Sequence, residues 1–63
     1  MKTATYTFNI YDQDSTNYLD EVIINLPIMK NDDVFDFIKL NKKEIEKIIS
    51  DYYNLNNIFY SLV

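Results

Sequence analysis

The most regular hydrophobic pattern of the chain lies between residues 42 and 62. Its apolar residues recur at alternating steps of three and four, which is the spacing of one face of an α-helix. Ile49 and Ile58 widen this face, and polar residues fill most of the opposite side. The pattern predicts a helix over residues 42–62. Six residues form its apolar stripe: Ile45, Ile48, Tyr52, Leu55, Phe59 and Leu62.

The end of this helix has an alternative. Asn54 is soon followed by two further asparagines, and asparagine is a poor helix former, so the helix could break there. A third strand over residues 58–63 would then follow. We favour the continuous helix, because the apolar stripe keeps its phase through Phe59 and Leu62.

The N-terminal part of the chain predicts an antiparallel β-hairpin. Residues 3–11 alternate between two kinds of side chain, which is the period of a strand buried on one face. Residues 12–17 are polar and rich in turn formers, and residues 18–26 predict the returning strand. Pro27 ends this strand because proline cannot donate a hydrogen bond to the ladder. The core-facing side chains would be Ala4, Tyr6, Phe8 and Ile10 on the first strand and Val22, Ile24 and Leu26 on the second.

A short helix is predicted over residues 32–40. Asn31 is a suitable N-cap, and Asp32 and Asp33 would place negative charge in the first turn, where it favours the start of a helix. The helix has more apolar residues than one face can hold, and Phe35 falls beside the face that would be buried.

The longer helix is expected to start at Lys42, because Asn41 and Glu44 have the spacing of a capping box. Together these elements predict a single α+β domain over residues 1–63. Its architecture would be an N-terminal antiparallel β-hairpin packed on one short and one longer C-terminal helix.

The small size of the chain favours a second subunit. A domain of 63 residues buries only about 60% of the surface that its unfolded chain exposes. It contains no Cys, so no disulfide stabilises it, whereas 48% of its residues are hydrophobic. We therefore predict a homodimer, whose interface is formed by the six residues of the apolar stripe together with Phe35.

Most of the residue types that build catalytic and metal sites are missing. The chain has neither Cys nor His, which excludes the common zinc, copper and iron sites and the usual pairs of nucleophile and base. Asp12, Asp14, Thr16 and Asp20 have the spacing of part of a calcium loop, but the glycine and the final glutamate of that loop are replaced. We expect no enzymatic activity, no metal and no cofactor.

The charge of the chain is negative and unevenly distributed. Ten acids stand against six lysines and no Arg, which gives a net charge of −4. Residues 1–36 hold seven of the acids and only two of the lysines. If the hairpin loop lies close to the start of the first helix, these acids form one negative surface that binds a protein and can occupy a groove built for nucleic acid. They are Asp12, Asp14, Asp20, Glu21, Asp32, Asp33 and Asp36.

Aromatic side chains add to this expected binding surface. Four of them fall outside the faces that the pattern predicts to be buried, and exposed aromatic residues are enriched at protein interfaces. They are Tyr11, Phe35, Tyr53 and Tyr60.

Two other functions fit parts of the sequence. Lys39, Lys42, Lys43 and Lys47 surround the junction of the predicted helices, which suggests a small DNA-associated regulator with a helix-turn-helix. The absence of Arg argues against it, because Arg makes the commonest specific contact with guanine. The second alternative is a structural subunit whose apolar stripe serves only assembly.

In general character the chain resembles the small phage-encoded anti-defence proteins, such as inhibitors of CRISPR systems. The resemblance rests on its short length, its acidity, its many Asn and Tyr residues and its lack of Cys, His and Gly. It implies stoichiometric binding to a bacterial host defence protein, which is thereby blocked. We expect a cytoplasmic protein, because no apolar stretch has the length of a secretory signal or a membrane span.

Overall fold

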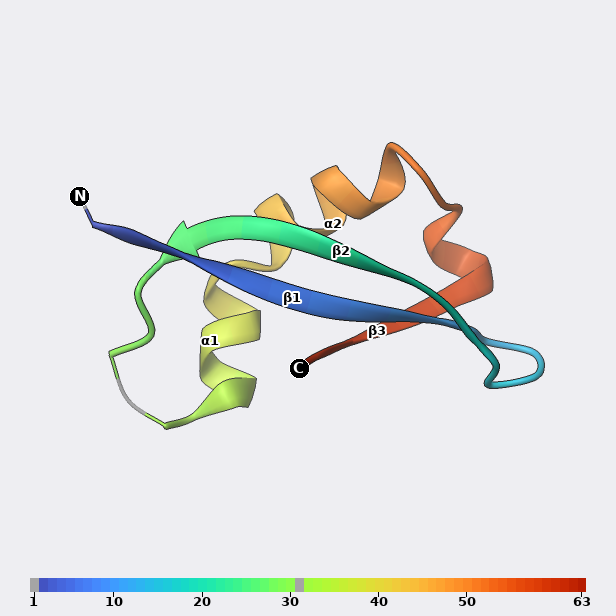
Figure 1. Cartoon of the computed structure of the whole chain (residues 1–63), viewed down its shortest axis with the longest axis horizontal. Coiled ribbons are helices and arrows are strands. Elements are labelled where there is room, and N and C mark those ends of the chain that lie inside the picture. Colours follow the sequence, from blue (N-terminus) through green and yellow to red (C-terminus); the bar gives the residue numbers. More distant parts are fainter. Residues whose placement is uncertain (1, 31) are drawn as a thin grey trace.

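Within the part of the chain that the structure describes, a three-stranded antiparallel sheet has the strand order β2-β1-β3, and two helices follow the hairpin in the sequence (Figure 1). The computed structural model describes residues 2–30 and 32–63. The side chains on one face of the sheet pack on the helices, whereas most of those on the other face, which we call the open face, are exposed. The elements are β1 Thr3–Asp12, β2 Tyr18–Pro27, α1 Val34–Leu40, α2 Lys42–Ser50, the 3-10 helix η1 Leu55–Asn57 and β3 Ile58–Leu62.

The predicted hairpin is confirmed. β1 and β2 pair in antiparallel register, with Phe8 opposite Val22 and Tyr6 opposite Ile24 on the face toward the helices. The register shifts between Ile10 and Tyr11, and this bulge leaves Leu19 without a partner on β1. β2 ends at Pro27, as the missing backbone donor of proline requires.

The two helices begin close to the predicted positions. α1 starts at Val34, two residues later than predicted, and Asp33 is its N-cap, since its side chain accepts a hydrogen bond from the backbone N–H of Asp36 (3.1 Å). The expected cap Asn31 lies outside the described residues. α2 starts at Lys42 as predicted.

The capping box expected between Asn41 and Glu44 is wrong. The Asn41 side chain makes no capping hydrogen bond to α2. Its Nδ2 instead donates to the backbone oxygen of Phe37 (2.8 Å), which also accepts the backbone N–H of Asn41 at the end of α1 (3.2 Å). Asn41 thus closes the first helix, and the second begins at the next residue.

The predicted helix over residues 42–62 is wrong, and with it the architecture of a hairpin followed only by helices. α2 ends at Ser50, and the chain returns to the sheet as β3, so the order of elements is β-β-α-α-β. Asn54 has an extended backbone, and its side chain accepts a hydrogen bond from the N–H of Asn56 (3.0 Å). This local bond competes with the helix, which is why asparagine favours caps and turns over helix interiors.

The alternative of a third strand is therefore the one that the structure adopts. β3 pairs with β1, with Tyr60 opposite Ile10 and Phe59 opposite Tyr11. Successive side chains of a strand point to opposite faces, so Tyr60 packs toward the helices and Phe59 lies on the open face. Ile58, the first residue of β3, lies opposite Asp12 and is buried in the core.

The core lies between the sheet and the helices. Two hydrogen bonds join distant segments at its margin: the N–H of Met29 donates to the hydroxyl of Tyr6 (2.9 Å), and the hydroxyl of Tyr60 donates to Oε2 of Glu46 (3.0 Å). Within the described residues, no buried side-chain polar atom lacks a partner. Eight buried hydrophobic residues form this core: Phe8, Ile10, Ile24, Leu26, Phe37, Ile45, Ile49 and Ile58.

Candidate partner-binding surface

Three aromatic rings cross the open face of the sheet near the hairpin loop. Tyr18 on β2, Tyr11 on β1 and Phe59 on β3 are direct cross-strand neighbours. The rings of Tyr11 and Phe59 stack, with centroids 5.2 Å apart and an angle of 16° between their planes. The rings of Tyr11 and Tyr18 meet edge to face at 6.0 Å. We call these three residues the aromatic row.

The aromatic row is accessible to a partner. The side chain of Tyr18 is 55% exposed and that of Phe59 is 41% exposed, while Tyr11 between them is half-buried. Ile23, further along β2 on the same face, is 62% exposed. The pair of Asn9 and Glu21 lies between Ile23 and the aromatic row on this face, and exposed apolar groups with polar residues around them are typical of an interaction surface.

Four of the predicted acidic residues lie at the hairpin end of the sheet, beside the aromatic row. Asp12 shapes the turn, since its carboxylate accepts hydrogen bonds from the N–H of Asp14 (2.9 Å) and the hydroxyl of Ser15 (3.0 Å). Asp20 accepts a hydrogen bond from the hydroxyl of Tyr53 (3.0 Å). Asp14 and Glu21 are exposed. Asp12 and Asp20 therefore stabilise the fold, whereas Asp14 and Glu21 are available to a partner.

The charged residues of the hairpin all have one sign. Residues 3–29 contain these four acids and no lysine. Partial burial, followed by the negative charges of Glu21 and Asp20, raises the pKa of Tyr18 above its ordinary value. Glu21 and Asp20 therefore act electrostatically on Tyr18 of the aromatic row.

The other three predicted acids lie elsewhere. Asp32, Asp33 and Asp36 lie at the start of α1, which is toward the opposite end of the longest axis from the hairpin loop (Figure 1). The longest extent of the molecule is 36 Å, well beyond the range of about 8 Å over which surface charges act at physiological salt. The seven acids therefore do not form a single negative surface.

The residues predicted to form a dimer interface do not share one face, because the helix that would have aligned them does not exist. Ile45 is fully buried, Ile48, Leu55 and Leu62 are half-buried, and Phe59 belongs to the aromatic row. Tyr52, just after α2, is 72% exposed, and Phe35 on α1 is 89% exposed. Tyr53 and Tyr60, expected on the surface, are half-buried through their bonds to Asp20 and Glu46.

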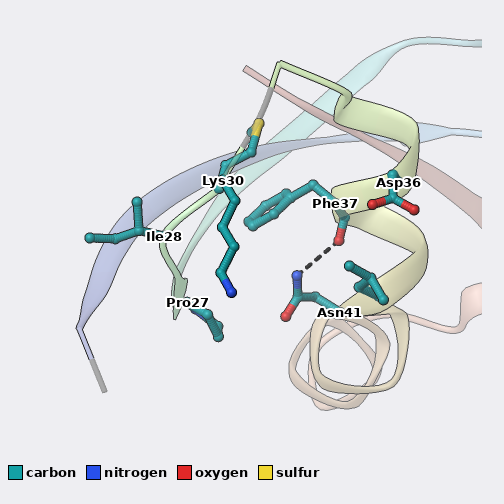
Figure 2. A pocket seen from close by; sticks show the side chains of 8 residues that line it. Pro27, Ile28, Lys30, Asp36, Phe37 and Asn41 are labelled. Carbon is teal, nitrogen blue, oxygen red and sulfur yellow. Dashed lines mark hydrogen bonds between the residues drawn. The ribbon is translucent and has the colours of Figure 1, made fainter.

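A second apolar surface lies at the α1 end. A pocket of about 290 Å³ separates α1 from the connector that follows β2, and Figure 2 shows the Phe37 ring pointing from α1 toward that connector. Leu40, on its border, is 75% exposed. The pocket is lined by Pro27, Ile28, Met29, Lys30, Asp36, Phe37, Leu40 and Asn41.

The four lysines that suggested a helix-turn-helix are exposed on α1 and α2. Only Asn41 separates the two helices, and α1 has seven residues. A helix-turn-helix joins its helices by a turn of about three to four residues. The spacing of these helices therefore differs from that of the motif.

The described residues give no geometry for a metal site. Nowhere among them do three or more potential ligands lie close together. Asp12, which occupies the first position of the partial calcium-loop pattern, accepts a hydrogen bond from the N–H of Asp14 within the hairpin turn. Within the same residues, no helix has both the length and the hydrophobicity to cross a membrane.

Sequence reasoning placed Tyr11 on the binding surface but missed Tyr18 and Ile23. The signal was present, because Tyr11 and Tyr18 flank the hairpin loop and such positions pair across the two strands. Phe59 was assigned to the helical stripe, so the strand that completes the aromatic row was not foreseen.

In comparisons with known proteins, no family model, no curated protein and no solved structure matches this chain.

Proposed function

We propose that this protein is a non-enzymatic binding module that docks on a positively charged surface of another protein. The observation that carries the proposal is the aromatic row, exposed on the open face of the sheet and flanked by Asp14 and Glu21. Aromatic residues are enriched in the energetically dominant centres of interfaces, and complementary charge accelerates the encounter and selects the partner.

The target class follows from the shape and charge of this surface. An exposed aromatic face with acids beside it and no lysine in residues 3–29 suits a groove that normally accepts nucleic acid. The general resemblance to small anti-defence proteins supports the same class. We therefore propose an inhibitor, of phage or mobile-element origin, that binds a host defence protein in the cytoplasm and blocks access of its nucleic acid.

A nucleic-acid-binding function is the main rival. Aromatic side chains on an open antiparallel sheet can stack with unpaired bases, and the exposed lysines of the helices could contact phosphates. The net charge of −4 opposes it. A titration with single-stranded and duplex DNA at several salt concentrations separates the two functions, since a nucleic-acid binder would lose affinity steeply with salt, whereas our proposal predicts no binding.

The proposal is tested by affinity capture from nuclease-treated bacterial cytosol on the immobilised protein. Variants Tyr18→Ser and Glu21→Lys change the aromatic row and its charge, while Phe35→Ser removes an aromatic ring that is even more exposed but lies on α1. We expect a host protein that is retained by the unmodified protein and by Phe35→Ser and is lost with Tyr18→Ser and with Glu21→Lys.

Two outcomes would contradict the proposal. Capture that is insensitive to Tyr18→Ser and Glu21→Lys would show that another surface binds. If Asp14→Lys and Glu21→Lys both leave inhibition of the host defence protein unchanged, the alternative of a purely structural subunit is favoured, because these charges have no role in it.

A further inference from the structure

A groove runs along the free edge of the sheet. It has a volume of about 240 Å³ and lies between β2 and the end of α2. Four consecutive residues of β2 border it, from Asp20 to Ile23, together with Ile48 and Tyr52. Consecutive strand residues point to opposite faces, so a groove bordered by both sets lies along the edge of the strand and not on either face.

The edge of β2 is unpaired within the described residues. In the strand order β2-β1-β3, β2 has β1 as a neighbour on one side only. Such an edge carries backbone donors and acceptors that can pair with an added strand. One backbone amide of β2 already has a partner, because Oδ1 of Asp20 accepts a hydrogen bond from the N–H of Glu21 (2.7 Å). Strand addition would therefore use mainly the part of β2 after Glu21.

The wall of the groove on the helix side is apolar. Val22 and Ile48 are half-buried and pack against the core, and Tyr52 is largely exposed above them. A strand added to β2 would place alternate side chains on this wall. Apolar side chains would fit there, whereas the intervening ones would lie beside Glu21 and Ile23 on the open face.

The rim of the groove is negatively charged. Asp20 and Glu21 come from β2. On α2, Glu44 precedes Ile48 by four residues, and Asp51, the C-cap of α2, follows it by three. Lys47 lies three residues after Glu44 and four before Asp51, so it neighbours both acids, and the rim keeps a net negative charge from four acids and one lysine. The acids on the rim therefore favour the binding of a segment with positively charged side chains.

We propose that the groove binds an extended segment of the partner protein, which adds as a strand to the edge of β2. Its apolar residues pack on Val22, Ile48 and Tyr52, and its alternating Lys or Arg residues face Glu21. This inference rests on the proposed function and deepens it, because the segment belongs to the same positively charged partner. It adds the backbone pairing and the alternating sequence by which that partner is recognised.

A second copy of this chain would suit the groove less well than a basic segment. Each copy carries a net charge of −4 and brings the same acids to the edge of β2, so a pair of edges would lack the positive partner that the rim selects.

The inference is tested with a short fluorescent peptide in which valine and lysine alternate, measured by fluorescence anisotropy with the full chain. We expect saturable binding that is abolished when glutamate replaces lysine. N-methylation of alternate backbone amides along one edge of the peptide should weaken binding at least about tenfold, because it removes the donors that pair with β2. Glu21→Lys should weaken it about tenfold as well, whereas Asp36→Lys on α1 should not.

Equal binding of the N-methylated peptide, or equal effects of Glu21→Lys and Asp36→Lys, would overturn strand addition. The same holds if the peptide does not bind while the host protein is still captured through Tyr18, in which case the proposed function stands alone. If neither peptide nor host protein binds, both proposals fail. Concentration-dependent shifts of β2 amides without peptide would assign the edge to a second copy, and would overturn the inference too.

Discussion

The ring of Phe59 stacks on the ring of Tyr11, joining β3 to the central strand on the open face of the sheet. The next residue, Tyr60, points to the other face and reaches Glu46 on α2. One strand thus contributes an exposed ring to the candidate binding surface and a half-buried ring to the packing of the helices. Binding and folding are therefore separable by substitutions at adjacent positions.

The core position of Ile45 predicts a large loss of stability on truncation. Ile45→Ala should lower the free energy of unfolding by about 2–5 kcal/mol, because Ile45 is fully buried and its removal leaves a cavity. Leu40→Ala, at a side chain that is 75% exposed, should change it by less than about 0.5 kcal/mol. Chemical denaturation followed by circular dichroism measures both. Similar effects of the two substitutions would mean that Ile45 lies outside the core.

The role of Asn54 distinguishes the observed fold from a continuous C-terminal helix. Its side chain caps η1 by accepting the N–H of Asn56, so Asn54→Ala should destabilise the protein by about 1 kcal/mol. In a continuous helix the same change would stabilise it, because alanine is the better helix former. Asn56→Ala is the matched control, since Asn56 supplies only its backbone to this bond. Denaturant midpoints of the three proteins give the sign of the effect.

The bond between Tyr60 and Glu46 predicts a loss of stability at high pH. Burial, the hydrogen bond to Glu46 and the charge of Glu46 raise the pKa of Tyr60 from about 10 to about 12. The folded state therefore holds this proton more tightly than the unfolded state. The resulting stabilisation is fully present below about pH 10 and disappears as the pH rises through about 12.

Tyr60→Phe tests this dependence. The difference in the free energy of unfolding between the unmodified protein and Tyr60→Phe should shrink as the pH rises from about 10 to about 12. The tyrosinate absorbance of the unmodified protein should also show a late ionisation that Tyr60→Phe removes. A pH-independent difference between the two proteins would rule out this account of Tyr60.

The homodimer stays a prediction. Of the residues expected at its interface, Phe35 on α1 is the most exposed. Size-exclusion chromatography with light scattering should give the mass of two chains for the unmodified protein and of one chain for Phe35→Ser. A monomer at every concentration, or a dimer that tolerates Phe35→Ser, would refute an interface at Phe35.

The hairpin could be predicted from the sequence because its signals are local. The alternation in β1 and β2, the polar loop and Pro27 all point to the same structure. The start of α2 at Lys42 was also predicted, although the capping box between Asn41 and Glu44 from which it was inferred does not form. Each of these elements depends mainly on residues within a few positions of one another.

The C-terminal strand could not be predicted with the same reasoning, because two periods coincide there. Leu55, Phe59 and Leu62 have helical spacing, while Ile58, Tyr60 and Leu62 alternate as in a strand. The pairing with β1, a contact between the two ends of the chain, decides between the periods. The position of Phe59 in the aromatic row depends on the same pairing, so this part of the site was missed for the same reason as the strand.

The central claim, that the aromatic row and its acids hold a protein partner, is tested most directly by an NMR footprint of the isotope-labelled protein with the captured host protein. We predict that the largest chemical-shift changes and the strongest broadening fall on Tyr11, Tyr18, Glu21, Ile23 and Phe59, and that Tyr18→Ser weakens the complex by about thirtyfold or more. Changes centred on Phe35 and Leu40, with Tyr18→Ser binding as tightly as the unmodified protein, would contradict it.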